Sequence, residues 1–354
     1  MSTAPRHDAA DPPRDLARYS RQIRCPEIGL AGQQAIKHAQ VTIVGCGALG
    51  GAAANLLARA GVGFMRIIDR DFIEVDNLQR QTLYDERDIA DCLPKAEAAA
   101  RKLRRINSTI EVEAVVADLT AANIEQYCDE SELLIDGTDN LETRFLLNDL
   151  AVERDVPWVY GACRAAEGLA LGIIPRRTPC LRCIWDELPA LGTVPTCDTA
   201  GILATTVNMV ASFQVTEALK ILMGRPEELL GLVALNAWTG RLRALHVQAA
   251  YDDGDCPCCK YDQYDYLHGD KLPAPTELCG RDAVQILPAE PQDLDFRRIE
   301  QRLPGTARAK CSEYMLRFSA DNLAVTVFSD GRAIIQGTTD PAAARRVLAK
   351  YVGV

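Results

Sequence analysis

The sequence has no long hydrophobic run, and this absence excludes the simplest membrane proteins. No stretch approaches the roughly 18 consecutive apolar residues that a transmembrane helix needs. The first residues, MSTAPRHDAADPPRDLARYSRQ, are polar and lack the apolar core of a secretory signal peptide. We therefore expect a cytoplasmic protein with no membrane partner.

The chain is also poor in clustered positive charge. It carries 39 Lys and Arg residues against 49 Asp and Glu residues, a net charge of −10, and it has no lysine-rich tract. Non-specific nucleic-acid binding depends on the neutralisation of phosphates, so this balance disfavours a nucleic-acid partner. Any nucleotide that the chain binds is expected to be a small molecule.

Segments of strand and helix character alternate along the first half of the chain. The 354 residues are 48% hydrophobic and 25% charged, enough for one large core plus a smaller module. Strands are expected at 41–44, 64–69, 110–116, 132–137 and 156–162, and helices near 50–60, 95–106, 121–128 and 140–153. Such alternation is typical of a mostly parallel sheet covered by helices, so we expect a doubly wound, Rossmann-like α/β domain.

Composition divides the chain into three parts. Residues 1–17 are rich in Pro, Asp and Ala and are expected to form a disordered or loosely attached tail. Residues 18–265 are expected to form the α/β domain, which includes a long helix over 202–223. A stretch rich in Asp, Tyr, Cys, Pro and Gly over 252–275 marks a boundary. Residues 276–354 then have the pattern of a small β-α-β-β-β-α module, with hairpin turns at SADN and SDG.

The segment VTIVGCGALGG, residues 41–51, has the character of a nucleotide-binding loop. Gly45, Gly47 and Gly50 follow an apolar strand and open an Ala- and Leu-rich helix, and the second strand ends in Asp69. Such a loop places backbone amides and a helix N-terminus against phosphate, and an acidic residue against a ribose hydroxyl. These contacts suit NAD, FAD and ATP about equally. The loop alone therefore leaves hydride transfer and adenylyl transfer both open.

Thirteen cysteines in a chain without a signal peptide indicate metal ligation, catalysis or burial in preference to disulfides. Two CxxC pairs, CLRC and CPCC, give the strongest single signal. Four thiolates supply the tetrahedral sulfur set that Zn²⁺ favours, and four protein ligands leave no open position for water. We expect a structural zinc site formed by Cys180, Cys183, Cys256 and Cys259, and the alternative is two unrelated redox or buried pairs. Cys258 lies inside the second pair and leaves the exact ligand set open.

Charged residues gather near the expected carboxyl ends of the strands. They are Asp69 and Asp71, the run DNLQRQ at 76–81, Lys95, and the run DGTDNLETR at 136–144. In a doubly wound sheet these strand ends converge on the crevice that binds the ligand. Taken alone, Arg80 or Lys95 would by default be a solvated surface charge, and Asp139 a turn or helix-capping residue. Together with the glycine loop they describe two cations and an acidic residue around a nucleotide.

This combination favours adenylation over hydride transfer. A carboxylate that attacks the α-phosphorus of ATP is already ionised at neutral pH, so the reaction needs no general base. The barrier lies in the charge on the phosphoryl oxygens and on the departing pyrophosphate, which Arg80, Lys95 and a Mg²⁺ ion held by Asp139 would neutralise. No His/Asp or Tyr/Lys proton relay of the kind that hydride transfer uses stands out in the sequence.

A series of motifs resembles, in order, the ThiF/MoeB/HesA adenylyltransferases, which are related to ubiquitin-activating enzymes. The resemblance covers about residues 18–260. In that family a homodimer adenylates the C-terminal Gly-Gly carboxylate of a small ubiquitin-like sulfur carrier. The matching segments are RYSRQIRCPEIGLAGQQAI, VTIVGCGALGG, IIDRDFIEVDNLQRQTLY, PKAEAA, IDGTDNLETRFLLND, CLRCIW, PTCDTAGILATTVNMVASFQVTEALKIL and CPCC.

The resemblance implies a role for each matching position. The 45–50 loop would contact phosphate, Asp69 would contact the ribose, and Arg21 would reach into the ATP site of the partner subunit. The implied catalytic residues are Arg80, Lys95, Asp139 and Cys197, of which Asp139 would also bind magnesium. The implied nucleotide-binding residues are Arg21, Gly45, Gly47, Ala48, Gly50, Asp69, Asp71, Asn77, Arg80, Gln81, Lys95, Asp139 and Asn140.

Two positions depart from the family pattern. Ala48 replaces a glycine of the usual GGLG, and its small side chain still permits close approach of phosphate. Cys92 replaces a glycine shortly before Lys95, which leaves the path of that loop open. Cys197 lies where relatives carry a cysteine near the adenylate. A thiolate there could accept the acyl group or carry sulfur, and a mobile loop cysteine without chemical function is the equal alternative.

Within the family, the segments CDTAGI, VASFQVTEALKIL and LCGRDAVQI look most like the ThiF of thiamine thiazole synthesis found in bacilli. The implied activity is ATP-dependent adenylation of a ThiS-like carrier, with ATP, Mg²⁺ and Zn²⁺ as cofactors. The close alternative is MoeB-type activation of the small subunit of molybdopterin synthase, and a non-catalytic nucleotide-binding scaffold is an alternative of another class. The implied partners are the carrier, a second copy of the chain and, as a candidate sulfur donor, a cysteine desulfurase.

The resemblance ends before the C-terminal module. The module lacks the cysteine-centred loop of a rhodanese domain, so we assign it no sulfur transfer. A sheet with a single helix has one covered face, and its other face or edge is available for a partner. We therefore expect residues 276–354 to hold the carrier or the dimer without touching ATP. The alternative is a module that merely packs on the main domain.

Overall fold

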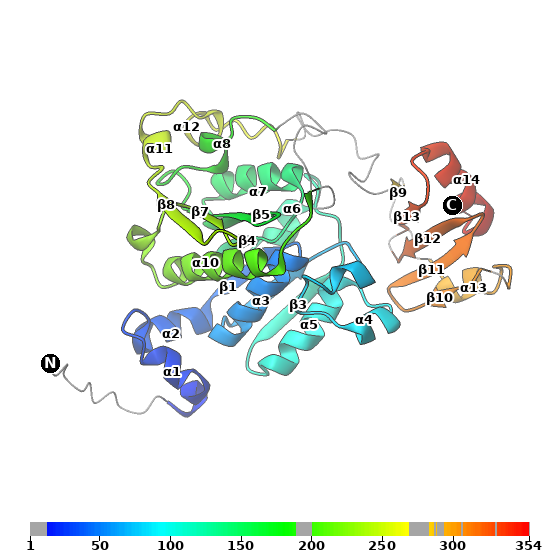
Figure 1. Cartoon of the computed structure of the whole chain (residues 1–354), viewed down its shortest axis with the longest axis horizontal. Helices are drawn as coiled ribbons and strands as arrows, with labels where there is room; N and C mark the ends of the chain where they lie inside the picture. The colour runs from blue at the N-terminus through cyan, green and yellow to red at the C-terminus, as the bar shows by residue number, and fades with distance from the viewer. Residues whose placement is uncertain are drawn as a thin grey trace, which may run out of the picture.

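The described residues form two separate β-sheets (Figure 1). The computed structural model describes residues 13–188, 200–268, 283–286, 288, 294–305, 307–329 and 331–353. The first sheet has eight strands in the order β3-β2-β1-β4-β5-β6-β7-β8, and the second has five in the order β10-β11-β12-β13-β9.

The first sheet is parallel on one side and antiparallel on the other. Its strands are β1 (Gln40–Val44), β2 (Phe64–Ile68), β3 (Glu111–Val115), β4 (Leu133–Asp136), β5 (Trp158–Arg164), β6 (Glu167–Ile173), β7 (Leu232–Asn236) and β8 (Arg241–Leu245). Strands β1 to β5 run parallel, and β6, β7 and β8 continue the sheet antiparallel. The chain order reverses between β1 and β4, and open α/β sheets bind their ligands at such a switch point.

Helices cover both faces of this sheet (Figure 1). Successive strand residues point to opposite faces, so Ile43 packs with the helices over 48–60, 95–106 and 204–222, whereas Val44 packs with those over 124–128 and 141–154. In the described part of the chain, no helix is both long enough and apolar enough to cross a membrane. The α-helices of this domain are α1 (Ser20–Ile23), α2 (Gly29–His38), α3 (Ala48–Ala60), α4 (Glu86–Ala90), α5 (Lys95–Ile106), α6 (Ile124–Cys128), α7 (Leu141–Arg154), α8 (Leu181–Ile184), α10 (Ala204–Leu222), α11 (Ala249–Asp252) and α12 (Pro257–Tyr261), and the 3₁₀ helices are η1 (Arg14–Tyr19), η2 (Val75–Asn77) and η3 (Pro226–Glu228).

The position of α3 follows from its sequence. Small residues in ALGGAAANLLARA let the helix lie close to the sheet, and most of its side chains are buried. The helix ends at Gly61, which takes the left-handed φ of 91° that glycine adopts without strain, while the Val62 amide donates to the Leu57 carbonyl. Gly47 precedes the first helical residue, so the N-terminus of α3 lies at the end of β1.

The structure confirms the alternating strands and helices expected from the sequence, with two corrections. Helix α6 begins at Ile124, three residues later than the expected start, because Thr120 and Asn123 first form a turn closed by the Asn123 side chain. The expectation of a disordered or loosely attached tail is also wrong for its last residues. Residues 14–19 form η1, in which Leu16 is buried and Asp15 pairs with Lys37.

The C-terminal module has the expected hairpins and one additional short strand. Asp321 and Asn322 both take positive φ in the turn that joins the strands over 315–320 and 323–328. Helix α14 packs on one face of the sheet, with Ala344, Val347 and Leu348 buried. The elements are β9 (Ala283–Ile286), α13 (Phe296–Glu300), β10 (Lys310–Cys311), β11 (Met315–Ala320), β12 (Leu323–Phe328), β13 (Ala333–Gln336) and α14 (Pro341–Tyr351).

The main domain covers the opposite face of the module sheet. Met315, Phe328 and Ile334 pack in one apolar cluster with Phe72, which lies in the loop after β2. The Arg317 guanidinium lies 4.9 Å from the centroid of the Phe72 ring. The expectation that this second face is available for a partner is therefore wrong, because the loop after β2 occupies it.

Candidate nucleotide site and cysteine cluster

A cavity of about 830 Å³ lies at the carboxyl ends of the parallel strands. Its wall contains the glycine loop after β1, residues 69–71 after β2, residues 117–119 after β3 and residues 137–141 after β4. The first residue of α5, Lys95, also lines it. The cavity thus occupies the switch point of the sheet, where doubly wound folds bind their ligands.

The residues of the glycine loop have two different functions: one permits close helix packing, and others line the cavity. A Cβ on Gly50 would lie 1.8 Å from the Gly45 carbonyl oxygen, so Gly50 permits α3 to pack against the loop and does not itself line the cavity. Gly47 and Ala48 do line the cavity, and Gly47 is the N-cap of α3. The first amides of α3 therefore lie at the cavity wall, where a helix N-terminus favours an anion such as phosphate.

Asp69 is fixed at the end of β2 by two backbone amides. Its carboxylate accepts from the Cys46 amide at 2.6 Å and from the Asp71 amide at 2.7 Å. Burial raises the pKa of Asp69, and the nearby Lys95 charge acts in the opposite direction. These contacts hold the carboxylate beside the glycine loop, as ribose recognition requires.

Lys95 is a buried cation in the same wall. Its side chain donates from Nζ to Asp71 Oδ2 at 3.0 Å, and the residue is 5% exposed. Burial acts to lower the pKa of Lys95, but the charges of Asp71 and Asp69 outweigh it and raise the pKa above its ordinary value. Arg80 and Gln81 line the wall as well, Arg80 half-buried and Gln81 buried. The structure thus brings together the two cations that the sequence singled out.

The remaining predicted nucleotide contacts occupy different positions. Asp139 is exposed in the cavity lining, and Asn140 lines the cavity while its Oδ1 accepts from the Glu142 amide and caps α7. Asn77 is buried and lies outside the lining. Its Oδ1 accepts from the Glu74 amide at 3.2 Å and closes a capping box around η2, so in this geometry it shapes the turn before Arg80.

Sequence reasoning missed Arg144, which supports the loop that carries Asp139. Arg144 is buried, and its Nε donates to Asp136 Oδ2 at 2.9 Å. Its Nη2 donates to the carbonyls of Thr138 and Gly161, at 2.6 Å and 2.9 Å. The signal was present in DGTDNLETR, where an acid and a cation flank the turn. The pairing of Arg144 with Asp136, eight residues earlier, could not be recognised from the sequence because it depends on the direction in which α7 runs.

Other cations in the lining were also missed. Arg70 Nη1 donates to both carboxylate oxygens of Asp118, each at 2.9 Å, at the end of the cavity formed by β2 and β3. Arg164, Arg241 and Arg243 line the opposite end, next to the antiparallel strands. The alternation of RLRAL in β8 could have indicated that Arg241 and Arg243 share one face. No histidine lies among the described lining residues.

The cysteine of the glycine loop is not a reactive group. Cys46 is fully buried, and burial raises the pKa of its thiol to about 12. The reactive form of cysteine is the thiolate, and a thiol with so high a pKa is almost entirely protonated at neutral pH. Shortly before α5, Cys92 adopts a φ of 51°, a conformation that favours glycine.

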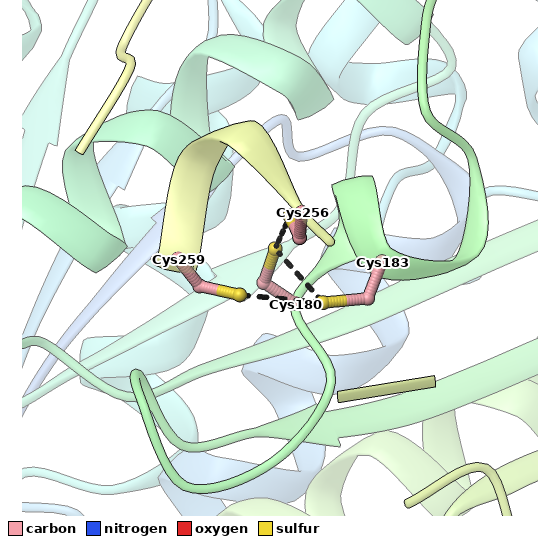
Figure 2. Close-up of side chains that lie close together, drawn as sticks. All are labelled: Cys180, Cys183, Cys256 and Cys259. Carbon is pink, nitrogen blue, oxygen red and sulfur yellow. Dashed lines mark hydrogen bonds between the residues drawn. The ribbon is translucent and has the colours of Figure 1, made fainter. Parts of the chain in front are cut away.

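The two CxxC pairs meet in one cluster (Figure 2). The Sγ atoms of Cys180, Cys183, Cys256 and Cys259 all lie within 4.8 Å of one another. Cys180 Sγ lies 3.6 Å from Cys256 Sγ and 3.8 Å from Cys183 Sγ, while Cys183 Sγ lies 3.3 Å from Cys259 Sγ. A regular tetrahedron with metal–sulfur bonds of about 2.3 Å separates its sulfurs by about 3.8 Å, so the set fits one zinc ion.

Asn148 of α7 holds both arms of this cluster. Its Oδ1 accepts from the Leu181 amide at 2.7 Å, and its Nδ2 donates to Cys258 Sγ at 3.3 Å. Cys258 is fully buried and lies outside the group of four. The grouping of the four Sγ atoms favours Cys256 and Cys259 as the second pair of ligands.

The described structure leaves the expected roles of two further residues untested. Cys197 lies outside the described residues, so its expected position near the adenylate stays a prediction. Arg21 is exposed on α1 and does not line the cavity of its own chain. Its expected role in the partner's site is therefore untested by one copy of the chain.

Comparison with known proteins agrees with this architecture. The chain is 40% identical over 337 residues to the sulfur carrier protein ThiS adenylyltransferase of Bacillus subtilis, which covers 95% of this chain and 99% of that protein. It is 36% identical over 252 residues to the sulfur carrier protein adenylyltransferase of Thermus thermophilus, covering 69% of this chain and 91% of that one. The solved structure of E. coli MccB with ATP has the same fold, with a TM-score of 0.57 at 21% identity over 70% of this chain and 76% of that chain. Residues 19–258 match the ThiF family over more than half of the chain. The chain therefore belongs to the ThiF family.

Proposed function

We propose that this chain adenylates the C-terminal carboxylate of a ThiS-type, ubiquitin-like sulfur carrier that ends in Gly-Gly. The observation that carries the proposal is the buried Lys95 ammonium in the same cavity as the glycine loop and Asp69. A fixed cation at the phosphate end of a nucleotide site stabilises the charge that develops during phosphoryl transfer. The match to the Bacillus protein named for ThiS, over nearly the full length of both chains, supports the choice of carrier.

The proposed reaction needs no proton relay. A carboxylate oxygen of the carrier attacks the α-phosphorus of ATP, the bond from that phosphorus to the bridging oxygen of the β-phosphate breaks, and pyrophosphate leaves with the electron pair. Lys95 and Arg80 would neutralise the oxygens of the polyphosphate during this step. The amides at the start of α3 would bind phosphate, and Asp69 would hold the ribose hydroxyls.

The cavity also offers a path for the carrier tail. Arg164, Arg241 and Arg243 line the end away from Asp69, beside the exposed edge strand β8. An extended Gly-Gly tail that enters there would bring its carboxylate toward the phosphate end. The positive charge at this entrance would attract an anionic carrier surface.

The side chains present fit both metals that the family implies. Asp139 is an exposed carboxylate at the phosphate end of the lining, and Mg²⁺ at nucleotide sites is commonly held by one or two carboxylates plus substrate phosphates. When bound there, Mg²⁺ would supply further neutralisation of the polyphosphate. The four-cysteine cluster would hold a structural Zn²⁺ that joins the 180–183 and 256–259 segments and takes no part in the reaction.

Carrier-dependent exchange of pyrophosphate into ATP tests the function. We expect exchange with a ThiS-type carrier and none with the same carrier lacking its last glycine. The carrier of molybdopterin synthase, offered in parallel, distinguishes the two pathways by its kcat/KM. Tight ATP binding without exchange for any Gly-Gly carrier would instead identify a nucleotide-binding scaffold.

A further inference from the structure

The C-terminal module reaches the nucleotide cavity through two buried polar side chains. Gln285 on β9 donates from Nε2 to Asp118 Oδ2 at 2.9 Å. Arg332, which immediately precedes β13, is 1% exposed and donates from Nη2 to the Arg70 carbonyl at 2.7 Å. Both acceptors, Asp118 and Arg70, belong to residues that line the cavity.

The two contacted residues form one unit in the wall. Arg70 donates to both carboxylate oxygens of Asp118, and Gln285 shares the second of these oxygens. The unit continues into the catalytic network, because Arg70 Nε lies 3.8 Å from Asp71 Oδ1 and the other Asp71 oxygen accepts from Lys95. A displacement of Asp118 or Arg70 would therefore move the wall beside Asp69.

The topology identifies which part of ATP this wall faces. The glycine loop follows β1, Asp69 follows β2, and Asp118 follows β3, and these strands are adjacent in the order β3-β2-β1. With phosphate on the loop and ribose at Asp69, the next position along the sheet edge belongs to the base. Arg70 and Asp118 thus lie at the nucleoside end of the site, opposite the entrance at β8.

The contact between module and loop is extensive enough to fix these side chains. Phe72, two residues after Arg70, packs with Phe328, Met315 and Ile334 of the module. The Arg332 guanidinium lies 3.8 Å from the centroid of the Phe328 ring, which orients its donor toward the loop. The loop after β2 is therefore held between the main sheet on one side and the module sheet on the other.

We propose that Gln285 and Arg332 are positioning residues that complete the nucleoside end of the ATP site. The module thereby acts on nucleotide affinity, whereas the sequence led us to expect that it serves the carrier or the dimer without touching ATP. This inference rests on the proposed function, because it assumes that the cavity binds ATP.

Two substitutions across the same interface provide a matched test. Gln285→Glu places a carboxylate against Asp118 in the cavity wall. Gln336→Glu places a carboxylate against Glu74, to which Gln336 donates at 3.2 Å, and Glu74 does not line the cavity. Both changes place two carboxylates against each other across the module interface, the first at the segment after β3 and the second at the loop after β2, but only the first acts on a lining residue. Because Arg332 is fully buried and its removal endangers the fold, the glutamine pair carries the test.

The measurement is calorimetric binding of AMP and of inorganic tripolyphosphate to the full-length variants, with thermal unfolding in parallel. We expect Gln285→Glu to weaken AMP binding about tenfold, the effect of about 1.4 kcal/mol, and to leave tripolyphosphate binding within twofold of wild type. Gln336→Glu should leave both affinities unchanged. The double variant Q285E/D118N should recover most of the AMP affinity, because the amide at 118 can donate to the new carboxylate.

Two results would overturn the inference. Equal AMP affinities in the Gln285→Glu and Gln336→Glu variants would show that the module does not act on the nucleoside end. Equal loss of AMP and tripolyphosphate binding would show a general loosening of the domain. Both differ from failure of the proposed function, in which the wild type binds no ATP or supports no carrier-dependent pyrophosphate exchange.

Discussion

Lys95 is the residue on which the proposed chemistry depends most. It is buried, paired with Asp71 and placed at the N-terminus of α5 beside the glycine loop. We expect Lys95→Ala to lower the rate of carrier-dependent pyrophosphate exchange by about 10² or more, the usual cost of removing one preorganised charge or donor. ATP binding should weaken less than the rate falls.

Lys102 on the same helix provides the control for this change. It pairs with Asp85 and Asp88 and does not line the cavity. Lys102→Ala should keep exchange within a few-fold of wild type. Exchange at the wild-type rate in Lys95→Ala would remove the catalytic assignment of Lys95.

Site residues that are marked by a local sequence pattern could be predicted, and those defined by contacts with distant residues could not. The glycine loop, Asp69 and Lys95 could be predicted from the sequence because local residue patterns mark the end of a strand and the start of a helix. Arg144 and Arg70 were not, since their functions depend on partners eight residues away and on another strand. The Asn77 side chain forms part of the capping box around η2, and this function depends on the geometry of the turn, which the sequence pattern does not give.

At the scale of elements, the cysteine cluster joins α8 to α12 and should contribute directly to folding. A site that exists only in the folded chain adds its binding free energy to stability. We expect Cys180→Ser to lose the zinc and to lower the melting temperature by at least about 5 °C, since one kcal/mol corresponds to roughly 2–4 °C in domains of 150–250 residues. Metal analysis and thermal unfolding check both parts.

Cys258→Ser is the matched control, because Cys258 lies between two of the proposed ligands and outside the group of four. This variant should retain one zinc per chain. A wild type free of zinc, or zinc loss from Cys258→Ser as complete as from Cys180→Ser, would contradict the ligand set.

The edge strand β8 allows a separate test of the entrance. Arg243 lines the cavity at the end away from Asp69, so Arg243→Glu should raise the KM for an anionic carrier about fivefold or more and leave the KM for ATP unchanged. Arg346→Glu, the same charge reversal at an exposed position of α14, should change neither value. A rise in the KM for ATP alone would place the entrance elsewhere.

Most elements were predictable because their periodicity is local. Helix α5 matches its expected range, and α10, expected over 202–223, is Ala204–Leu222. The covering of the second face of the module was not predictable, because it depends on Phe72, a residue more than 200 positions away that the sequence does not link to the module. Helix α6 is shorter than expected because the Asn123 side chain accepts from the Thr120 amide and closes a turn over 120–123. Helix propensity alone does not predict this turn.

At the scale of the whole molecule, we expect two chains to share each active site. Arg21 is exposed on α1, outside the cavity of its own chain, and we propose that it serves the site of a partner copy. Arg21→Ala and Lys95→Ala should each lose exchange activity. An equimolar mixture allowed to exchange subunits should regain about a quarter of the wild-type activity, because half the dimers are mixed and one of their two sites is intact.

The control for this experiment is a mixture of Lys95→Ala with Arg80→Ala. Both residues line the same cavity, so each chain supplies its own pair. Every site of a mixed dimer then lacks one of the two cations, and this mixture should restore no activity. Mixing the same variant with itself should restore nothing. Absence of recovery in the Arg21 mixture, with subunit exchange verified by tagged chains, would contradict a shared site.

The most direct test of the central claim follows the phosphorus atom that the carrier acquires. The protein is incubated with a ThiS-type carrier and with ATP labelled either at the α- or at the γ-phosphorus, and the carrier is isolated under acidic conditions. We expect the carrier to gain label from the α position and none from the γ position, with pyrophosphate released in equal amount. Label from the γ position would show phosphoryl transfer, and an unlabelled carrier with ATP bound would show a scaffold. Either result would contradict adenylation by this chain.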